Sequence, residues 1–211
     1  MIDWYYIYSQ RYERFHEYLQ NKVDKDIYNL RGLFVDQSVF DEHLYKHENE
    51  HFFSRITVKV EAIIMIIKNR MTYTKEPFFF SDCDIMIGSL VNTLSKYINA
   101  PVDIYFQQEY RGSDVVNPGF MLIWPNEKTL AFWNYILNDI VKNNTMEMGS
   151  INLYIKEGTI NHKVFSYIDV CTTLTYSQKD YGICHLLSSA QGREDDMLEK
   201  LFQTRLLGQP L

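Results

Sequence analysis

Apolar residues along the chain occur in two patterns, short continuous runs and stripes with helical spacing. The runs predict strands at residues 4–8, 33–35, 78–80, 102–106 and 164–168, and a further strand that ends at 124 after a turn at 117–120. The stripes predict helices at 10–22, 55–70, 89–98, 125–137 and 195–204, and a short helix or turn at 147–155. Such alternation, beginning strand, helix, strand, is typical of a parallel sheet with right-handed crossovers. We therefore expect one α/β domain over residues 1–211, with a central mixed, mostly parallel sheet flanked by helices.

The most informative stretch is 78–87, Phe-Phe-Phe-Ser-Asp-Cys-Asp-Ile-Met-Ile. Its apolar start indicates a buried strand, and open α/β sheets bind ligands at the carboxyl ends of their strands. Asp82 and Asp84 follow that strand, where a turn lets both carboxylates converge, although an extended chain would point them to opposite faces. Two like charges buried together need a cationic partner, and Mg²⁺ or Mn²⁺ prefers carboxylate oxygen. The alternative is a pair of solvated loop residues.

Composition narrows the range of partners. The net charge is −6 and the pI is about 5.5, which argues against non-specific nucleic-acid binding because that needs a basic surface. Aromatic residues reach 15% and are spread along the chain, so they are candidates for the core and for stacking on sugars or bases. Cys83, Cys171 and Cys184 are widely spaced, which indicates neither a disulfide framework nor a zinc knuckle and favours a reducing compartment.

The chain shows no recognisable targeting pattern. Its N-terminus lacks the features of a signal peptide, and no apolar run approaches the roughly 20 residues of a membrane span. We therefore expect a soluble, cytoplasmic protein without a membrane span. The tail at 206–211, Leu-Leu-Gly-Gln-Pro-Leu, is typical of the start of a linker, which suggests the N-terminal part of a longer polypeptide.

Residues 47–51, His-Glu-Asn-Glu-His, match the pattern H-E-x-x-H. On a helix, His47 and His51 would share one face and could bind zinc, with Glu48 as the general base. This face is polar all round, and no third ligand follows at a recognisable spacing. A solvated helix is therefore the favoured interpretation, and a zinc-dependent hydrolase is kept as an alternative function.

Two basic residues, Arg55 and Lys59, lie one turn apart on the amphipathic helix that leads into the Asp-Cys-Asp strand. Their spacing alone favours ordinary surface charges. The alternative is that they neutralise a diphosphate bound at the end of that strand.

The order of these features resembles that of the nucleotide-diphospho-sugar transferases, glycosyltransferases of the GT-A (Rossmann-like) fold that carry an Asp-x-Asp motif. The resemblance covers residues 52–155 and rests on Arg55 and Lys59, the strand with Asp82 and Asp84, the segment Asn117-Pro118-Gly119-Phe120, and the helix at 129–133. The chain further resembles a chlorovirus-encoded glycosyltransferase domain of similar size.

The resemblance implies roles for particular residues. Asp84 is expected to bind a divalent metal that bridges the two phosphates of the donor, and Asp82 to contact the metal shell or the ribose. His185 lies in a segment similar to the family's His-containing segment and is expected to complete the metal site, although the usual Lys-Pro-Trp continuation is missing. The residues expected to contact the donor are Tyr8, Asp36, Arg55, Lys59, Asp82, Asn117 and Asn152.

Residues 147–152 resemble the family's Asp-Gln…Asn segment, with Glu147 in place of the Asp, Met148 in place of the Gln and Asn152 as the Asn. An inverting transferase needs a general base on the acceptor side, for which Glu147 and Asp114 are the candidates. A retaining transferase can rely on the leaving phosphate. The resemblance leans to retention, and the residues themselves leave both outcomes open.

The function that follows is a metal-dependent glycosyltransferase that uses Mn²⁺ or Mg²⁺ and moves a sugar from a nucleotide sugar, foremost a UDP-sugar, to a glycan or glycoprotein. Residues 1–100 would form the nucleotide-binding half and 101–211 the acceptor-binding half. The viral resemblance suggests capsid glycan synthesis in a host cytoplasm. Besides the zinc hydrolase, the alternative is a non-catalytic carbohydrate-binding module whose aromatic residues stack on a ligand.

Overall fold

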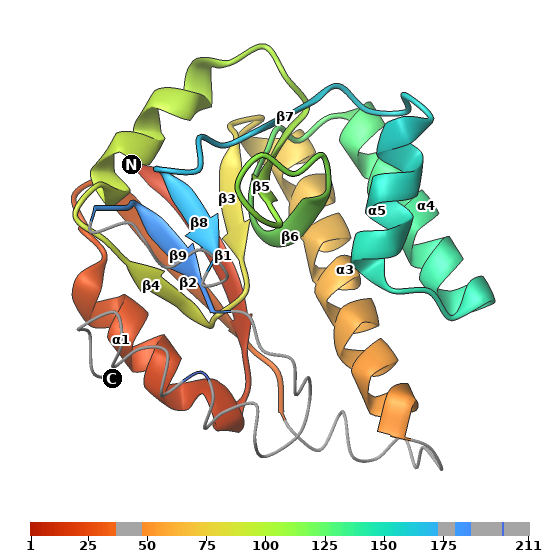
Figure 1. Cartoon of the computed structure of the whole chain (residues 1–211), viewed down its shortest axis with the longest axis horizontal. Helices are drawn as coiled ribbons and strands as arrows, with labels where there is room; N and C mark the ends of the chain where they lie inside the picture. The colour runs from red at the N-terminus through yellow and green to blue at the C-terminus, as the bar shows by residue number, and fades with distance from the viewer. Residues whose placement is uncertain (37–47, 173–179, 187–199, 201–211) are drawn as a thin grey trace.

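The computed structural model describes residues 1–36, 48–172, 180–186 and 200 (Figure 1), with the side chains of 48–55 left out of the description. The helix expected at 195–204 therefore lies outside the described residues, apart from Lys200. No helix in the described part of the chain is both long and apolar enough to cross a lipid bilayer.

A six-stranded sheet forms the centre of the molecule. Its strands, in spatial order, are β2 (Tyr28–Phe34), β1 (Ile2–Tyr8), β3 (Phe78–Ser81), β6 (Val116–Ile123), β5 (Ile104–Gln108) and β7 (His162–Val164). Strand β6 is antiparallel to both of its neighbours, and the other three pairs are parallel. The predicted central sheet, mixed but mostly parallel, is confirmed.

The sequence pattern did not predict a second sheet, which has three strands in the order β4 (Ile85–Ile87), β9 (Ile183–His185) and β8 (Val170–Thr172). Each strand has only three residues, too few for a period of two to stand out. Strand β4 follows the Asp-Cys-Asp motif directly, so the chain leaves the central sheet through that motif and enters the second sheet.

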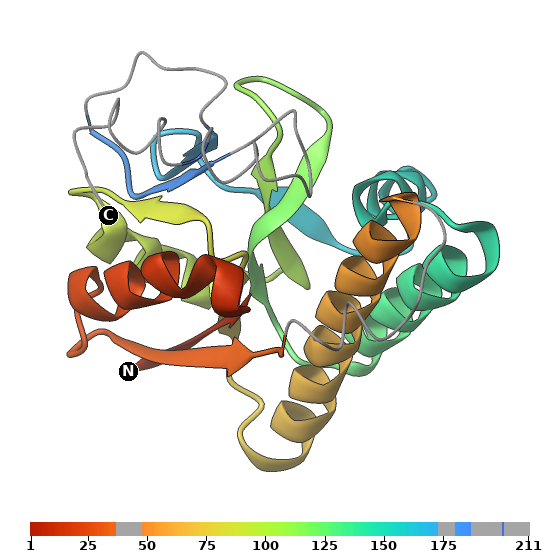
Figure 2. The ribbon, with the colours of Figure 1, turned by 90° about the horizontal axis from the view of Figure 1, so that it is seen from below.

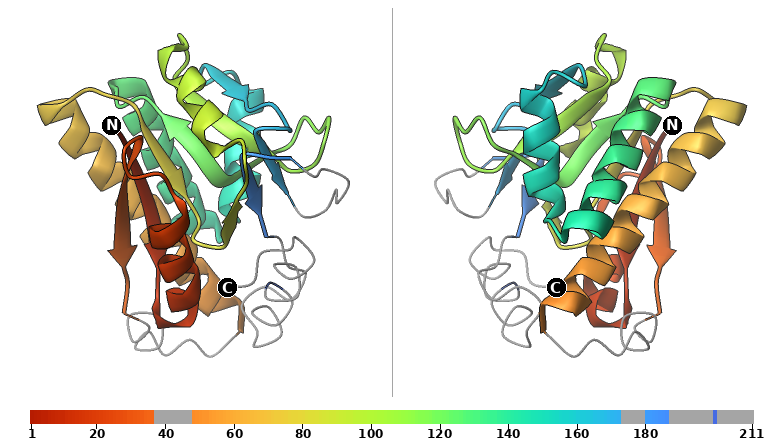
Figure 3. Two further views of the ribbon diagram at one scale, coloured as in Figure 1. Left: turned by 90° about the vertical axis from the view of Figure 1, so that its left-hand side faces the viewer. Right: turned by 90° about the vertical axis from the view of Figure 1, so that its right-hand side faces the viewer.

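Helices and the small sheet cover the central sheet on both faces. Helices α3 (Glu48–Tyr73), α4 (Glu127–Asn143) and α5 (Glu147–Lys156) cover one face (Figure 3). The 3₁₀ helix η1 (Gln10–Tyr12), α1 (Glu13–Lys22), the 3₁₀ helix η2 (Val91–Asn99) and the small sheet lie on the other (Figure 2). In β3, Phe79 packs into one core and Phe78 and Phe80 into the other, as the alternation of an extended strand requires.

Several expected boundaries were wrong. The turn expected at 117–120 lies inside β6, where the partners of Phe106 and Gln107 jump from Met121 to Asn117. Proline has no N–H to donate to a ladder, and Pro118 is placed in this irregular segment. The helix expected at 89–98 is a 3₁₀ helix at 91–99. The strand expected at 164–168 runs from 162 to 164, because residues 166–169 form a turn in which the Asp169 N–H donates to the Ser166 carbonyl at 2.9 Å.

One partly exposed ion-pair network, in which only the Arg70 side chain is buried, ties β1, β2 and α3 together. The Asp3 carboxylate accepts hydrogen bonds from Asn29 Nδ2 at 2.6 Å and Arg31 Nε at 2.9 Å, and it also pairs with Arg70 of α3. Burial opposes ionisation of Asp3, but the hydrogen bonds from Arg70, Arg31 and Asn29 outweigh it and lower the pKa of this carboxyl.

We expect Asp3→Asn to lower the free energy of unfolding by about 1.5–3 kcal/mol at pH 7, the range for hydrogen bonds to charged groups. Because the folded-state pKa is lowered, the stabilisation is present above the unfolded pKa of about 3.9 and disappears as the pH falls through the folded pKa. Urea unfolding at pH 7 and near pH 3 measures both. Asp26→Asn, in an exposed turn, is the matched control. A loss of equal size at both pH values would contradict the prediction.

Candidate active site

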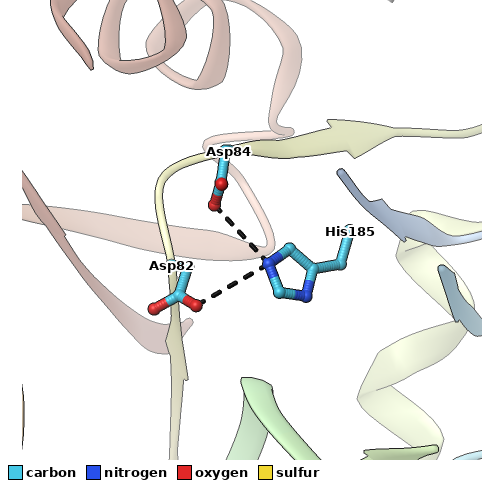
Figure 4. Close-up of side chains that lie close together, drawn as sticks. All are labelled: Asp82, Asp84 and His185. Atoms are coloured by element: carbon cyan, nitrogen blue, oxygen red, sulfur yellow. Dashed lines mark ion pairs between the residues drawn. The ribbon is translucent and has the colours of Figure 1, made fainter. Parts of the chain in front are cut away.

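The Asp-Cys-Asp motif connects the two sheets and is held by both. The Asp82 N–H donates to the Gly119 carbonyl of β6 at 2.9 Å, which extends the β3–β6 pairing by one residue. The Leu186 N–H, just after β9, donates to the Asp84 carbonyl at 3.0 Å. With its backbone fixed at both ends, the motif turns both carboxylates toward the end of β9 (Figure 4).

His185, the last residue of β9, faces both carboxylates with one ring nitrogen. Its Nε2 lies 3.7 Å from Asp82 Oδ2 and 3.6 Å from Asp84 Oδ1. The three candidate ligand atoms lie within 4.8 Å of one another, and the Asp84 and His185 side chains are buried. The structure therefore brings together the three residues that were predicted as metal ligands.

Two lysines bind the remaining carboxylate oxygens. Lys59 Nζ, from α3, lies 2.7 Å from Asp82 Oδ1 and 2.7 Å from Glu147 Oε1, at the start of α5. Lys200 Nζ pairs with Asp84 Oδ2. Each aspartate thus gives one oxygen to a lysine and turns the other toward the imidazole. The interpretation of Lys59 as a surface charge was wrong, because this side chain is buried against two carboxylates that attract it.

The charged groups of this cluster shift one another's pKa values. Burial alone would lower the pKa of Lys59, but Asp82 and Glu147 raise it well above its ordinary value. Burial alone would raise the pKa of Asp84, but Lys200 and His185 hold it well below its ordinary value. For Glu147, burial exceeds the attraction of Lys59, and its pKa is raised. Asp84 is therefore a carboxylate at neutral pH, and Glu147 is the group that takes up a proton more readily.

Gly119 makes room for the imidazole. A Cβ on this residue would lie 2.2 Å from both Cε1 and Nδ1 of His185, so no larger residue fits here without moving the ring. Asn117 shapes the same segment: its Oδ1 accepts from the Gly119 N–H at 2.7 Å, and its Nδ2 donates to Glu109 Oε2 at 2.5 Å. Asn117, which was predicted to bind the donor, thus holds the backbone of Gly119, the residue against which His185 packs.

The donor set suits a divalent cation. The two carboxylate oxygens are ligands that Mn²⁺ and Mg²⁺ prefer, the imidazole nitrogen is a ligand for transition metals, and the glycine at 119 leaves the ring in place to offer Nε2. Asp82, Asp84 and His185 are therefore the residues that would hold the ion.

The other predicted site residues lie as follows. Tyr8, at the end of β1, stacks on His16 with ring centroids 4.1 Å apart, and Asp36 is exposed after β2. Asn152 is engaged with β6, since its Oδ1 accepts from the Val116 N–H and its Nδ2 donates to the Val116 carbonyl, both at 2.9 Å. Asp114 is exposed in the loop between β5 and β6. Their roles in donor binding or catalysis stay predictions.

The side chain of Arg55 lies outside the described part of the structure. The zinc pattern at 47–51 also lies outside it, since neither His47 nor the side chains of 48–51 are described.

Sequence reasoning missed two residues of this site. Lys200 belongs to no recognisable motif, and nothing in its local pattern links it to Asp84. Gln107 donates to, or accepts from, His185 Nδ1 at 3.2 Å. Its signal was present, since it is a polar residue at the carboxyl end of a strand, where open α/β sheets place ligand-binding groups.

Comparison with known proteins identifies the fold, which is that of the GT-A glycosyltransferases. No family model matches the sequence, and no curated protein matches it. A glycosyltransferase involved in glycosylation of the major capsid of PBCV-1 is similar over 94% of this chain and 98% of its own, with 15% identity and a TM-score of 0.65. GlyE of Streptococcus pneumoniae TIGR4 is similar over 99% of this chain and 63% of its own, with 14% identity and a TM-score of 0.56. The galactosyltransferase LgtC, in complex with donor and acceptor sugar analogues, is similar over 98% of this chain and 95% of its own, with 10% identity and a TM-score of 0.53.

We expect Gly119→Ala to weaken Mn²⁺ binding by about 10–100-fold, the range for changes that disturb the support of a metal ligand, because the added methyl displaces His185. Isothermal titration or Mn²⁺ electron paramagnetic resonance, without nucleotide, measures the affinity. Gly149→Ala is the matched control, because a Cβ there meets nothing within 4 Å. Thermal unfolding of both variants shows whether the fold is kept. Unchanged Mn²⁺ affinity in Gly119→Ala would contradict the prediction that His185, positioned by its close packing on Gly119, is a metal ligand.

Proposed function

We propose that this protein is a metal-dependent glycosyltransferase that moves a sugar from a nucleotide sugar, foremost a UDP-sugar, to a hydroxyl of a glycan or glycoprotein. The observation that carries the proposal is the pair of aspartates at the end of β3, Asp82 partly buried and Asp84 buried, each with one oxygen turned toward His185 Nε2. The glycosyltransferase fold supports sugar transfer as the reaction that uses this site.

The chemistry of such a transfer explains why these groups are needed. A bound divalent cation neutralises the charge that develops on the diphosphate leaving group. Asp82, Asp84 and His185 are the residues that would hold that cation. Lys59 and Lys200 keep positive charge at the same carboxylates, so the cluster is not strongly anionic where an anionic donor arrives.

Glu147 is our favoured candidate for the group on the acceptor side. It is buried at the first position of α5, its pKa is raised, and it hydrogen-bonds to Lys59, which also contacts Asp82. A carboxyl with a raised pKa is better suited to accept a proton from an acceptor hydroxyl than an exposed one. In a retaining reaction the same carboxylate would orient the reacting sugar, and the family resemblance leans to retention.

Finer proposals concern the donor, the division of the chain and the biological setting. Mn²⁺ is the preferred cofactor and Mg²⁺ the second choice. Residues 1–100 bind the nucleotide and 101–211 the acceptor. The capsid glycosyltransferase among the structural neighbours supports a role in viral capsid glycan synthesis, which would take place in a host cytoplasm.

A thermal-shift panel tests the proposal. We expect UDP or a UDP-sugar to raise the melting temperature only when Mn²⁺ is present, since a ligand that binds only the folded state stabilises it by about 2.7 kcal/mol at one hundred times its Kd. Asp84→Asn should abolish this metal-dependent shift, whereas Asp26→Asn should keep it.

Other outcomes would favour the alternatives. A shift with zinc alone that His47→Ala abolishes would favour the hydrolase. Metal-dependent nucleotide binding without donor hydrolysis or transfer, across a panel of donors and acceptors, would favour a binding module.

A second experiment separates the two candidate bases. We expect Glu147→Gln to lower kcat by about 10²–10⁴-fold, the usual contribution of a general acid–base group, with little change in nucleotide affinity. Asp114→Asn, in an exposed loop, should lower it by less than a factor of ten. Steady-state transfer assays measure kcat for both variants. A larger loss of kcat in Asp114→Asn than in Glu147→Gln would assign the role of general base to Asp114.

A further inference from the structure

Gln107 is a buried polar residue with an incomplete set of hydrogen bonds. It lies in β5, is completely buried, and its Nε2 is 3.2 Å from His185 Nδ1. Its Oε1 is buried and has no hydrogen-bond partner among the described residues. A buried amide oxygen without a partner is costly, so the arrangement requires an explanation.

The two ring nitrogens of His185 have different surroundings. Nε2 faces the oxygens of Asp82 and Asp84, and Nδ1 faces Gln107. An imidazole that binds a cation through Nε2 must leave that nitrogen unprotonated, so its one proton lies on Nδ1. The group opposite Nδ1 must then be an acceptor.

The amide of Gln107 can act as donor or acceptor toward Nδ1. With its nitrogen toward Nδ1, as in this structure, it donates, and the ring proton lies on Nε2, opposite the two carboxylates. After a rotation of the amide by half a turn, its oxygen accepts the proton of Nδ1 and Nε2 is free for a cation. The amide nitrogen and oxygen have nearly the same size, so both orientations fit one cavity.

Little besides His185 decides between the two orientations. Since Oε1 has no partner in the described part of the chain, rotating the amide breaks no other hydrogen bond made by that oxygen. The ring itself has little room to move, because it packs against Gly119, where even a Cβ would approach to 2.2 Å. What changes is therefore the position of the ring proton and the orientation of the amide.

We propose that Gln107 is a positioning residue that sets the tautomer of His185, presenting its amide oxygen to Nδ1 when a divalent cation is bound at Nε2 and its amide nitrogen when the proton is on Nε2. The imidazole carries one proton in both states, and that proton moves from Nε2 to Nδ1. The inference rests on the proposed function, because it assumes that the site binds a cation.

The first test measures Mn²⁺ affinity without donor, by electron paramagnetic resonance at one fixed pH. Gln107→Met has a similar length but offers neither an N–H nor an oxygen, and it should weaken binding about 10–100-fold, as loss of the partner of a metal-binding histidine does. Gln107→Glu offers an oxygen in either orientation and should bind at least as tightly as the wild type. Gln108→Met is the matched control, because Gln108 is the next residue of the strand and contacts Ser113 instead; its affinity should stay within about a factor of two.

The second test observes the ring directly. In protein labelled with ¹⁵N at its six histidines, with His185 assigned by a substitution, the proton should lie on Nε2 without a cation and on Nδ1 with saturating Mg²⁺. The role of Gln107 is read from the variant, because replacing a merely structural glutamine would leave the His185 nitrogen signals as they are in the wild type. In Gln107→Met, the Nδ1–H signal of the Mg²⁺ form should lose its protection from exchange with water.

The outcomes separate the two proposals. If the wild type binds Mn²⁺ and Gln107→Met binds it equally well, the role of Gln107 is wrong and the metal-dependent function stands. If the ring carries protons on both nitrogens without a cation, Gln107 must accept in both states and the rotation is wrong. If the wild type binds no divalent cation at all, the proposed function fails, and the role of Gln107 fails with it.

Discussion

The site depends on a balance of charge at the end of β3. Two aspartates are placed there, next to the core of an aromatic-rich sheet, where unpaired carboxylates would be strongly unfavourable. The cations that compensate them come from two separate segments, with Lys59 on α3 and Lys200 later in the chain, and His185 at the end of β9 faces the remaining oxygens. The packing of α3 and of the small sheet against the central sheet is therefore tied to the charge state of the site.

The arrangement leaves one oxygen of each aspartate available. Had the lysines contacted both oxygens of each carboxylate, the cluster would be a closed structural salt bridge. Instead, Asp82 Oδ2 and Asp84 Oδ1 both face one imidazole nitrogen at 3.6–3.7 Å, beyond ordinary hydrogen-bonding distance. The lysines reduce the repulsion between the aspartates, and the remaining oxygens form a site of the size and chemistry that a divalent cation prefers.

The sequence predicted the parts of the fold that depend on local pattern. The triple phenylalanine of β3, with one ring in one core and two in the other, is visible as a continuous apolar run, and the convergence of Asp82 and Asp84 follows from the turn after it. What it did not predict depends on contacts between distant segments. Three-residue strands such as β4 have no periodicity to detect, and Lys200 reaches Asp84 only through the folded chain. Asn117 to Gly119 have the composition of a turn, yet they are held in β6 by neighbouring strands, a case in which tertiary pairing overrides local preference.

The connection of the two sheets through the Asp-Cys-Asp motif gives the site a mechanical aspect. Asp82 is hydrogen-bonded to β6 of the central sheet. Asp84 directly precedes β4 of the small sheet, and His185 is the last residue of β9 in that sheet. A cation bound by all three residues would cross-link the two sheets, whose segments are far apart in sequence. Local unfolding of either sheet would separate the three ligands and release the cation. The strands β4, β8 and β9 are short and make few hydrogen bonds with one another, so the stability of the small sheet would depend on whether the site is occupied. Folding of the small sheet and binding of the cation would then be one cooperative event.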